Sequence, residues 1–211
     1  MSPDPRFSVP PIVVDHDDRW IEIDLRGDLK AWARQSAGDI RQRARAAGQD
    51  RGPGERQLAG MLAGAAALAR RAQDTTLALL LYPTLADGMV ALARFCLVDL
   101  AGREGDAAWS DLVGWLTPGG GAGEAEITEL EGAARPCRRV RRRYAEGGGG
   151  ERPVGEHLGY AWVLDDYGAG VVLVTSFTDL EAAGRWRAAL DALARGVTLD
   201  PAAGAERGTL G

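Results

Sequence analysis

The sequence predicts an α+β protein with a mainly antiparallel central sheet flanked by helices, arranged as an α/β/α sandwich. Two hairpin patterns predict this class. β-branched and aromatic residues fill residues 160–164 and 171–177, a glycine-bearing turn separates them, and a helix from 179 to about 195 follows. Two longer apolar runs, 75–82 and 89–100, are joined by a segment with Pro83 and Gly88. Because these runs are nearly continuous, we expect central strands with both faces covered.

The remaining elements follow from periodicity. Residues 20–25 alternate as a half-buried strand, and Asp28 is placed to cap the next helix. In residues 55–72 an apolar face is expected, and its glycines lower helix stability or permit close packing. The sequence also predicts a short helix near residue 110 and strands at 124–130 and 137–144. A Thr178–Glu181 capping box is expected to begin the last helix. The first helix is expected to bury Leu29, Trp32, Ala33, Ser36 and Ile40, and the second Leu58, Met61, Leu62, Ala65, Leu68 and Ala69.

Length and composition indicate one ordinary globular domain. We expect an extended arm over residues 1–18, a single α+β domain over 19–197 and a flexible tail over 198–211. The 211 residues carry a net charge of −5, which argues against general nucleic-acid binding. Cys96 and Cys137 form no CxxC motif and are expected to be buried free thiols. No signal peptide or membrane span is visible, so a cytoplasmic protein is expected.

Several patterns that superficially suggest chemistry favour structural interpretations. The segment Asp15–His16–Asp17–Asp18 could hold a cation, but a solvated turn explains it better, and we expect no metal and no cofactor. The glycine tracts at 118–123 and 147–150 lack the Lys-Ser/Thr of a phosphate loop. Ser176 has no flanking glycines for a nucleophile elbow, and His157 is expected near a strand end. The sequence therefore favours a protein that is not an enzyme, although carboxylates from different strands could still form an acid–base pair.

The strongest binding candidate is an arginine-rich strand at residues 135–144. Arginine forks recognise carboxylates and phosphates, so this strand suits an acidic partner. Alternation places Arg139, Arg141 and Arg143 on one face and Arg138 with Arg142 on the other. The alternative is an edge strand whose charges prevent aggregation and pair with the abundant acidic residues. The candidate partner-binding residues are Arg138, Arg139, Arg141, Arg142, Arg143 and Trp115.

Four pieces of the chain carry a family resemblance: WIEIDL, CRRVRRRY, YAWVLDDYGAGVVLVTSFTDL and the last helix. Their order resembles an actinobacterial family of cytosolic proteins with the PsbP-like fold, of the Mog-type and LpqN-like kind. Lys30 is the only lysine, a bias typical of a high-G+C genome. The resemblance implies a binding or assembly factor rather than an enzyme.

We therefore expect a non-catalytic cytosolic adaptor or accessory protein that binds an acidic protein partner, in a specialised secretion or toxin–immunity system. The alternative is a small-molecule or lipid carrier with an apolar pocket between the helices and the sheet. An enzyme of another type is the third possibility.

Overall fold

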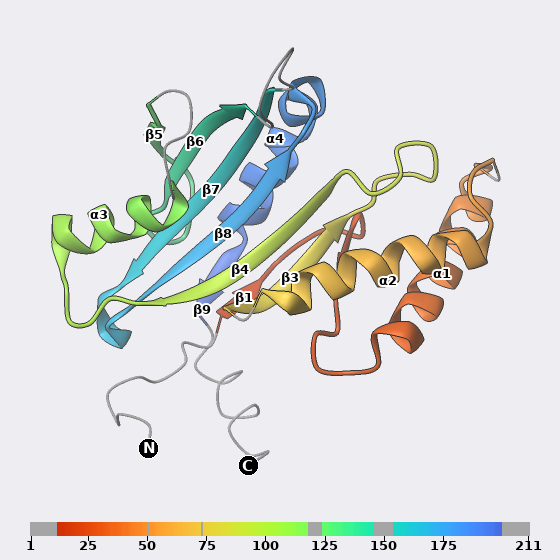
Figure 1. Cartoon of the computed structure of the whole chain (residues 1–211), viewed down its shortest axis with the longest axis horizontal. Helices are drawn as coiled ribbons and strands as arrows, with labels where there is room; N and C mark the ends of the chain where they lie inside the picture. Colours follow the sequence, from red (N-terminus) through yellow and green to blue (C-terminus); the bar gives the residue numbers. More distant parts are fainter. Residues whose placement is uncertain (1–11, 50, 73, 118–123, 146–153, 200–211) are drawn as a thin grey trace. The chain divides into compact units, whose positions relative to one another are not determined.

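The computed structural model describes residues 12–49, 51–72, 74–117, 124–145 and 154–199 (Figure 1). It confirms the predicted α+β class, with helices that accompany an antiparallel sheet. The helices of these ranges are α1 (Leu29–Ala46), α2 (Glu55–Arg71), α3 (Gly105–Leu116), α4 (Leu180–Arg195) and the 3₁₀ turn η1 (Asp165–Tyr167). The strands are β1 (Ile12–Val14), β2 (Trp20–Glu22), β3 (Thr75–Leu81), β4 (Ala91–Asp99), β5 (Glu126–Glu129), β6 (Arg138–Ala145), β7 (Val154–Leu164), β8 (Ala169–Phe177) and β9 (Val197–Leu199).

Within the described ranges the strands form a seven-stranded sheet in the order β2-β3-β4-β8-β7-β6-β5, and β1 pairs with β9 in a separate small sheet. The chain divides into two compact units. We call residues 17–95 the α1–α2 unit, and residues up to His16 together with those from Cys96 onward the α3–α4 unit. No helix in the described ranges is long and apolar enough to cross a membrane.

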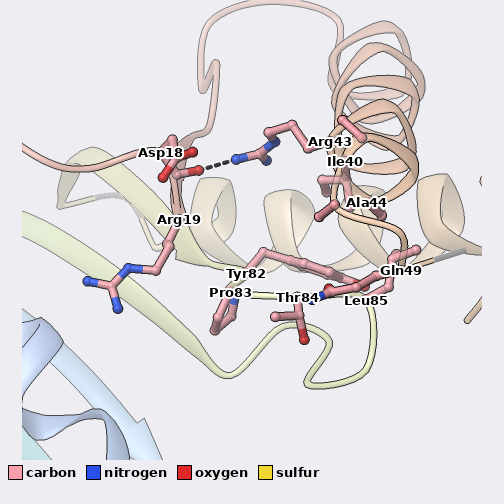
Figure 2. Close-up of a pocket in the computed structure, with 12 residues that line it drawn as sticks. Asp18, Arg19, Ile40, Arg43, Ala44, Gln49, Tyr82, Pro83, Thr84 and Leu85 are labelled. Atoms are coloured by element: carbon pink, nitrogen blue, oxygen red, sulfur yellow. Dashed lines mark hydrogen bonds between the residues drawn. The ribbon is translucent and has the colours of Figure 1, made fainter. Parts of the chain in front are cut away.

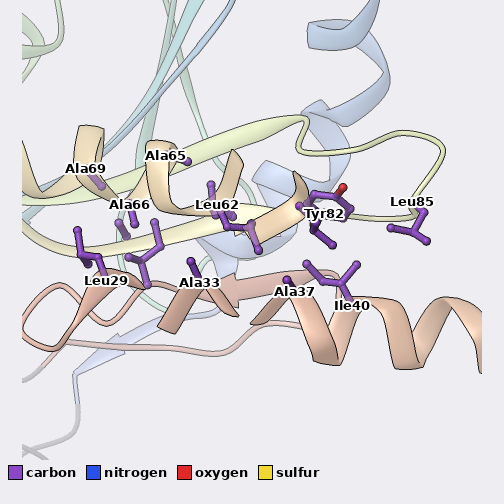
Figure 3. Packing of buried hydrophobic residues seen from close by; sticks show 14 of the residues in the cluster. Leu29, Ala33, Ala37, Ile40, Leu62, Ala65, Ala66, Ala69, Tyr82 and Leu85 are labelled. Atoms are coloured by element: carbon purple, nitrogen blue, oxygen red, sulfur yellow. The ribbon is translucent and has the colours of Figure 1, made fainter. Parts of the chain in front are cut away.

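In the α1–α2 unit, small side chains let the two helices and β3 pack closely. The Asp28 carboxylate accepts hydrogen bonds from the backbone N–H groups of Lys30 and Ala31, as the sequence predicted. Figure 3 shows alanines of α1 and α2 facing one another, with Tyr82 beyond the end of β3. The buried cluster of this unit includes Ile23, Ala33, Ala37, Ile40, Leu58, Leu62, Ala66, Ala69, Ala78 and Leu80.

The predicted buried face of α2 is partly wrong. Leu58, Leu62 and Ala65 are buried as expected, but Met61 is 47 % exposed and Leu68 is 61 % exposed. The buried arc is narrower than the predicted one and is completed by alanines, because close packing against α1 requires small side chains. Met61 and Leu68 therefore project from α2 beside its buried arc, at a spacing of two helical turns.

In the α3–α4 unit, α3 and α4 cover opposite faces of β7. Leu116 of α3 lies so close to Gly159 that a Cβ at this glycine would be 2.6 Å from Leu116 Cδ2. The next residue of β7, Tyr160, instead donates a hydrogen bond from its hydroxyl to Asp191 of α4, over 2.7 Å. Because successive strand residues point to opposite faces, the two helices sandwich this part of the sheet.

Glycine is required where α3 meets the hairpin. A Cβ at Gly170 of β8 would be 2.4 Å from Leu112 Cδ2, which is closer than real Cβ contacts allow. The glycines at 159 and 170 thus provide the space that the two leucines of α3 fill. The sequence assigned Gly170 to the turn, whereas it lies inside β8.

Several boundaries also differ from the predicted ones. Asp179, not Thr178, caps α4, since its carboxylate accepts from the backbone N–H of Glu181. Glu181 pairs with Arg185 instead of completing a capping box. β7 begins at Val154, six residues before the predicted start, and β1 and β9 fall where no strands were expected. Such short strands carry too few residues for a periodic signal. The predicted glycine-rich connections at 118–123 and 147–150 lie outside the described residues.

Candidate functional site

The arginines of β6 are largely engaged within the fold. Arg139 Nη1 is 2.9 Å from Asp191 Oδ2, and both side chains are mostly buried. Arg141 pairs with Glu126 of β5, so β6 is not an edge strand of the sheet. These contacts match the alternative in which arginines pair with nearby acids. Because Arg139 faces α4 whereas Arg138 lies over Trp109 of α3, these two arginines occupy opposite faces of the strand, as predicted.

The second face of β6 contacts α3. The Arg138 guanidinium lies 4.4 Å from the centre of the Trp109 ring, and Arg142 donates to the Thr117 carbonyl over 3.0 Å. Trp115 is half-buried against the cluster that includes Val140. Arg143 is exposed. A partner at this strand would thus have to compete with internal contacts at four of the five arginines, and the arginine-strand site remains a prediction.

The sheet face beneath α4 holds buried ionisable groups. Glu156 of β7 is only 2 % exposed, and its carboxylate accepts from Arg187 Nη2 over 3.0 Å. Burial raises the pKa of the Cys137 thiol from its ordinary 9.0 to about 12. Burial, followed by the hydrogen bond to Asp191, also raises the pKa of Tyr160. Cys96 and Cys137 are buried free thiols, as predicted.

These shifts predict loss of stability in alkali. A thiol whose pKa is raised in the folded state contributes stability that is fully present below its unfolded value, near 9, and that is lost as pH rises toward 12. The unfolded chain gains the thiolate first, so the free energy of unfolding should fall by up to about 1.4 kcal/mol per pH unit in this window. Denaturant titrations from pH 8 to 11 on wild type and Cys137→Ala measure this. Equal slopes in both proteins would contradict it.

The structure brings two polar residues of the hairpin together. His157 Nδ1 is 2.7 Å from Ser176 Oγ, and the His157 ring stacks on Tyr144 with centroids 4.1 Å apart. Ser176 is exposed and lies in β8, not on a strand-to-helix elbow. Asp15–Asp18 are all exposed, and no group of three or more potential metal ligands occurs within the described ranges.

A pocket of about 460 Å³ lies within the α1–α2 unit, where the C-terminal end of α1 meets the segment that follows β3 (Figure 2). Its volume falls in the range typical of small-molecule sites. Ile40, Ala44, Pro83 and Leu85 form its apolar wall. Its polar lining consists of Asp18, Arg19, Arg43, Gln49, Tyr82 and Thr84.

Tyr82 is the most unusual residue of this pocket. It is 3 % exposed, and its buried hydroxyl has no hydrogen-bond partner among the described residues. An unpaired buried polar group costs about 1–3 kcal/mol, so such groups are rare in folded proteins. Burial also raises the pKa of Tyr82 above its ordinary value.

The two arginines of the pocket differ in their partners. Arg19 Nε is 3.0 Å from Asp17 Oδ2, so its charge is compensated outside the pocket lining. Arg43 donates to the backbone carbonyl of Asp18, as Figure 2 shows, and has no carboxylate partner in the described part of the chain. Sequence analysis did not select Arg43 or Tyr82. The available signal was a tyrosine that ends an otherwise apolar run.

A second hollow of about 440 Å³ adjoins the exposed side of α2. It shares Tyr82 and Leu85 with the first pocket and is also lined by Pro53, Gln57 and Met61.

Comparison of the chain with protein-family models, curated proteins and solved structures finds no match. The assignment of function therefore depends on the geometry of these surfaces.

Proposed function

We propose that this protein is a non-catalytic binding protein whose partner is another protein, and that the partner docks an acidic amphipathic helix on the exposed face of α2. The observation that carries the proposal is the exposure of Met61 and Leu68 on one side of this helix. Exposed methionine and leucine side chains adapt to a partner's apolar face and gain free energy when they are covered.

Glycines close to these two side chains allow a helix to approach closely. A Cβ at Gly60 or at Gly64 would meet nothing within 4 Å, so neither glycine is needed for packing inside the fold. Other helical glycines, such as Gly184 of α4, are also open. The α2 pair differs because Gly64 lies between Met61 and Leu68, and Gly60 lies one turn before Gly64. Ridges of a partner helix fit over small residues bordered by larger ones.

The charges of α2 favour an acidic partner over a second copy of the chain. Arg56, Arg70 and Arg71 are exposed toward the two ends of the helix, whereas its acidic residue, Glu55, stands at the first position. Antiparallel pairing of two α2 helices around Gly64 would bring Arg56 of one copy near Arg71 of the other. Like charges at this distance repel, whereas acidic residues that flank an apolar stripe would pair with them.

The partner and its binding segment can be tested together. A photo-crosslinking amino acid at position 68 should capture a protein in extracts of the source organism, and the same residue at position 184 should not. Peptide mapping of the adduct should locate the crosslink in an acidic amphipathic helix. A crosslink to a second copy of this chain, or to a segment without apolar and acidic residues, would overturn the proposal.

Alanine substitutions at Gly60 and Gly64 should affect binding and folding in opposite directions, so they test the two separately. Gly60→Ala with Gly64→Ala should raise the free energy of unfolding by about 1 kcal/mol per site, yet weaken binding of the mapped partner helix about tenfold or more, because the added methyl groups keep the helices apart. Leu68→Glu should weaken binding about thirtyfold or more. Gly184→Ala is the matched control, with the same gain in stability and unchanged affinity in calorimetric titration. Full affinity in the double alanine variant would exclude close packing on this face.

A further inference from the structure

Beyond the docking of a protein on α2, the pocket that Tyr82 lines carries opposite charges that do not pair with each other. Arg43 contributes a guanidinium without a carboxylate partner, and Asp18 contributes a carboxylate to the same lining. The other cation of the lining, Arg19, pairs with Asp17, and the Asp18 carboxylate adds only a weaker attraction that comes last among the causes of the raised Arg19 pKa. The pocket is therefore close to neutral overall but keeps one charge of each sign available.

The C-terminal end of α1 adds a second attraction for positive charge. Ala46 and Ala47, at this end, line the pocket. Carbonyl groups in the last turn of a helix carry partial negative charge. A ligand with two negative charges, such as a phosphate monoester, would be repelled by these carbonyls and by Asp18. A ligand that bears both an anion and a cation would complement both the Arg43 guanidinium and the Asp18 carboxylate.

We propose that this pocket binds a small zwitterion of the amino-acid type with an apolar side chain, as a free amino acid or a short peptide. The ligand carboxylate accepts hydrogen bonds from Arg43 and from the Tyr82 hydroxyl, and its ammonium group lies toward Asp18 and the end of α1. The apolar side chain packs on Ile40, Pro83 and Leu85.

The orphan hydroxyl is the independent sign of a ligand. Tyr82 leaves a buried donor unsatisfied in the structure, and a carboxylate oxygen would be a strong acceptor for it. Since the hydroxyl is covered, a lining side chain has to turn aside as the ligand enters. Gln49 is exposed and lines the same pocket, so it has the freedom to move in this way.

Calorimetric titration of the full chain with defined probes tests the charge pattern. L-leucine or L-leucyl-L-leucine should bind saturably, and the preferred probe distinguishes an amino acid from a peptide. N-acetyl-L-leucine lacks the ammonium group and L-leucinamide lacks the carboxylate, so each should bind about tenfold more weakly than L-leucine or not at all. Absence of binding by both zwitterions at about 10 mM, or equal binding of all probes, would overturn the proposal.

Variants then assign the contacts. Tyr82→Phe removes the orphan hydroxyl alone, so it should weaken zwitterion binding about tenfold without lowering the melting temperature. Arg43→Gln should weaken binding at least as much, while Arg34→Gln, on the same helix but outside the pocket, should leave it unchanged. Unaltered affinity in both Tyr82→Phe and Arg43→Gln would exclude this pocket as the site. Arg43 lines neither the second hollow nor the exposed face of α2, so a failure of Arg43→Gln to weaken binding is distinct from failure of partner docking.

Discussion

Arg187→Met is expected to lower the free energy of unfolding by about 3–5 kcal/mol. The substitution keeps the length of the side chain but leaves the carboxylate of Glu156, 2 % exposed, without its 3.0 Å partner. A buried charge that loses its partner keeps the full cost of removal from water. Urea titration at neutral pH, followed by circular dichroism, measures the change.

Two further variants distinguish a stranded charge from lost packing. Arg185→Met removes an exposed arginine of the same helix, which pairs with Glu181, and should change stability by less than about 1 kcal/mol. The double variant Glu156→Leu with Arg187→Met should recover most of the loss, because it removes both charges. If Arg187→Met were as mild as Arg185→Met, Glu156 would have to be solvated in solution.

Leu112→Ala is expected to lower the free energy of unfolding by about 2–5 kcal/mol. Leu112 has no exposed surface and fills the space above Gly170, so its truncation opens a cavity between α3 and the hairpin. Gly170→Ala alone should cost about 1–3 kcal/mol, because its Cβ would overlap the leucine.

The combination of these two changes tests the contact directly. In Leu112→Ala with Gly170→Ala, the new methyl group occupies part of the cavity, so the double variant should lose less than the sum of the single losses. Val113→Ala, at the half-buried next position of α3, serves as the control and should be additive with Gly170→Ala. Strict additivity for the first pair would mean that the helix does not pack on this glycine.

The fold was predictable from the sequence because its elements carry local signals. Asp28 caps α1 as expected, and the long apolar runs became strands β3 and β4, although alternate residues of β4 are only half-buried. Periodicity was insufficient for the exposed side of α2, since it identifies an apolar stripe but not which part of the stripe a neighbouring helix covers. The narrow alanine-rich contact with α1 leaves Met61 and Leu68 outside.

The candidate sites were harder to predict because they depend on distant contacts. The arginines of β6 looked available for a partner, yet Arg139 meets Asp191, 52 residues later in the chain. Arg43 and Tyr82 come from a helix and a strand end that show no shared motif, and only the folded α1–α2 unit places both in one pocket. The sequence could not show that the Tyr82 hydroxyl lacks a hydrogen-bond partner, because this depends on where all neighbouring groups lie in the folded chain.

The small sheet of β1 and β9 has a mechanical consequence. Ile12 lies opposite Leu199, and Val14 opposite Val197, in antiparallel register. A force applied at residues 12 and 199, which face each other at one end of this ladder, would therefore break its residue pairs one after another rather than all together. Tension between these two positions would be relieved at low force in the β1–β9 ladder.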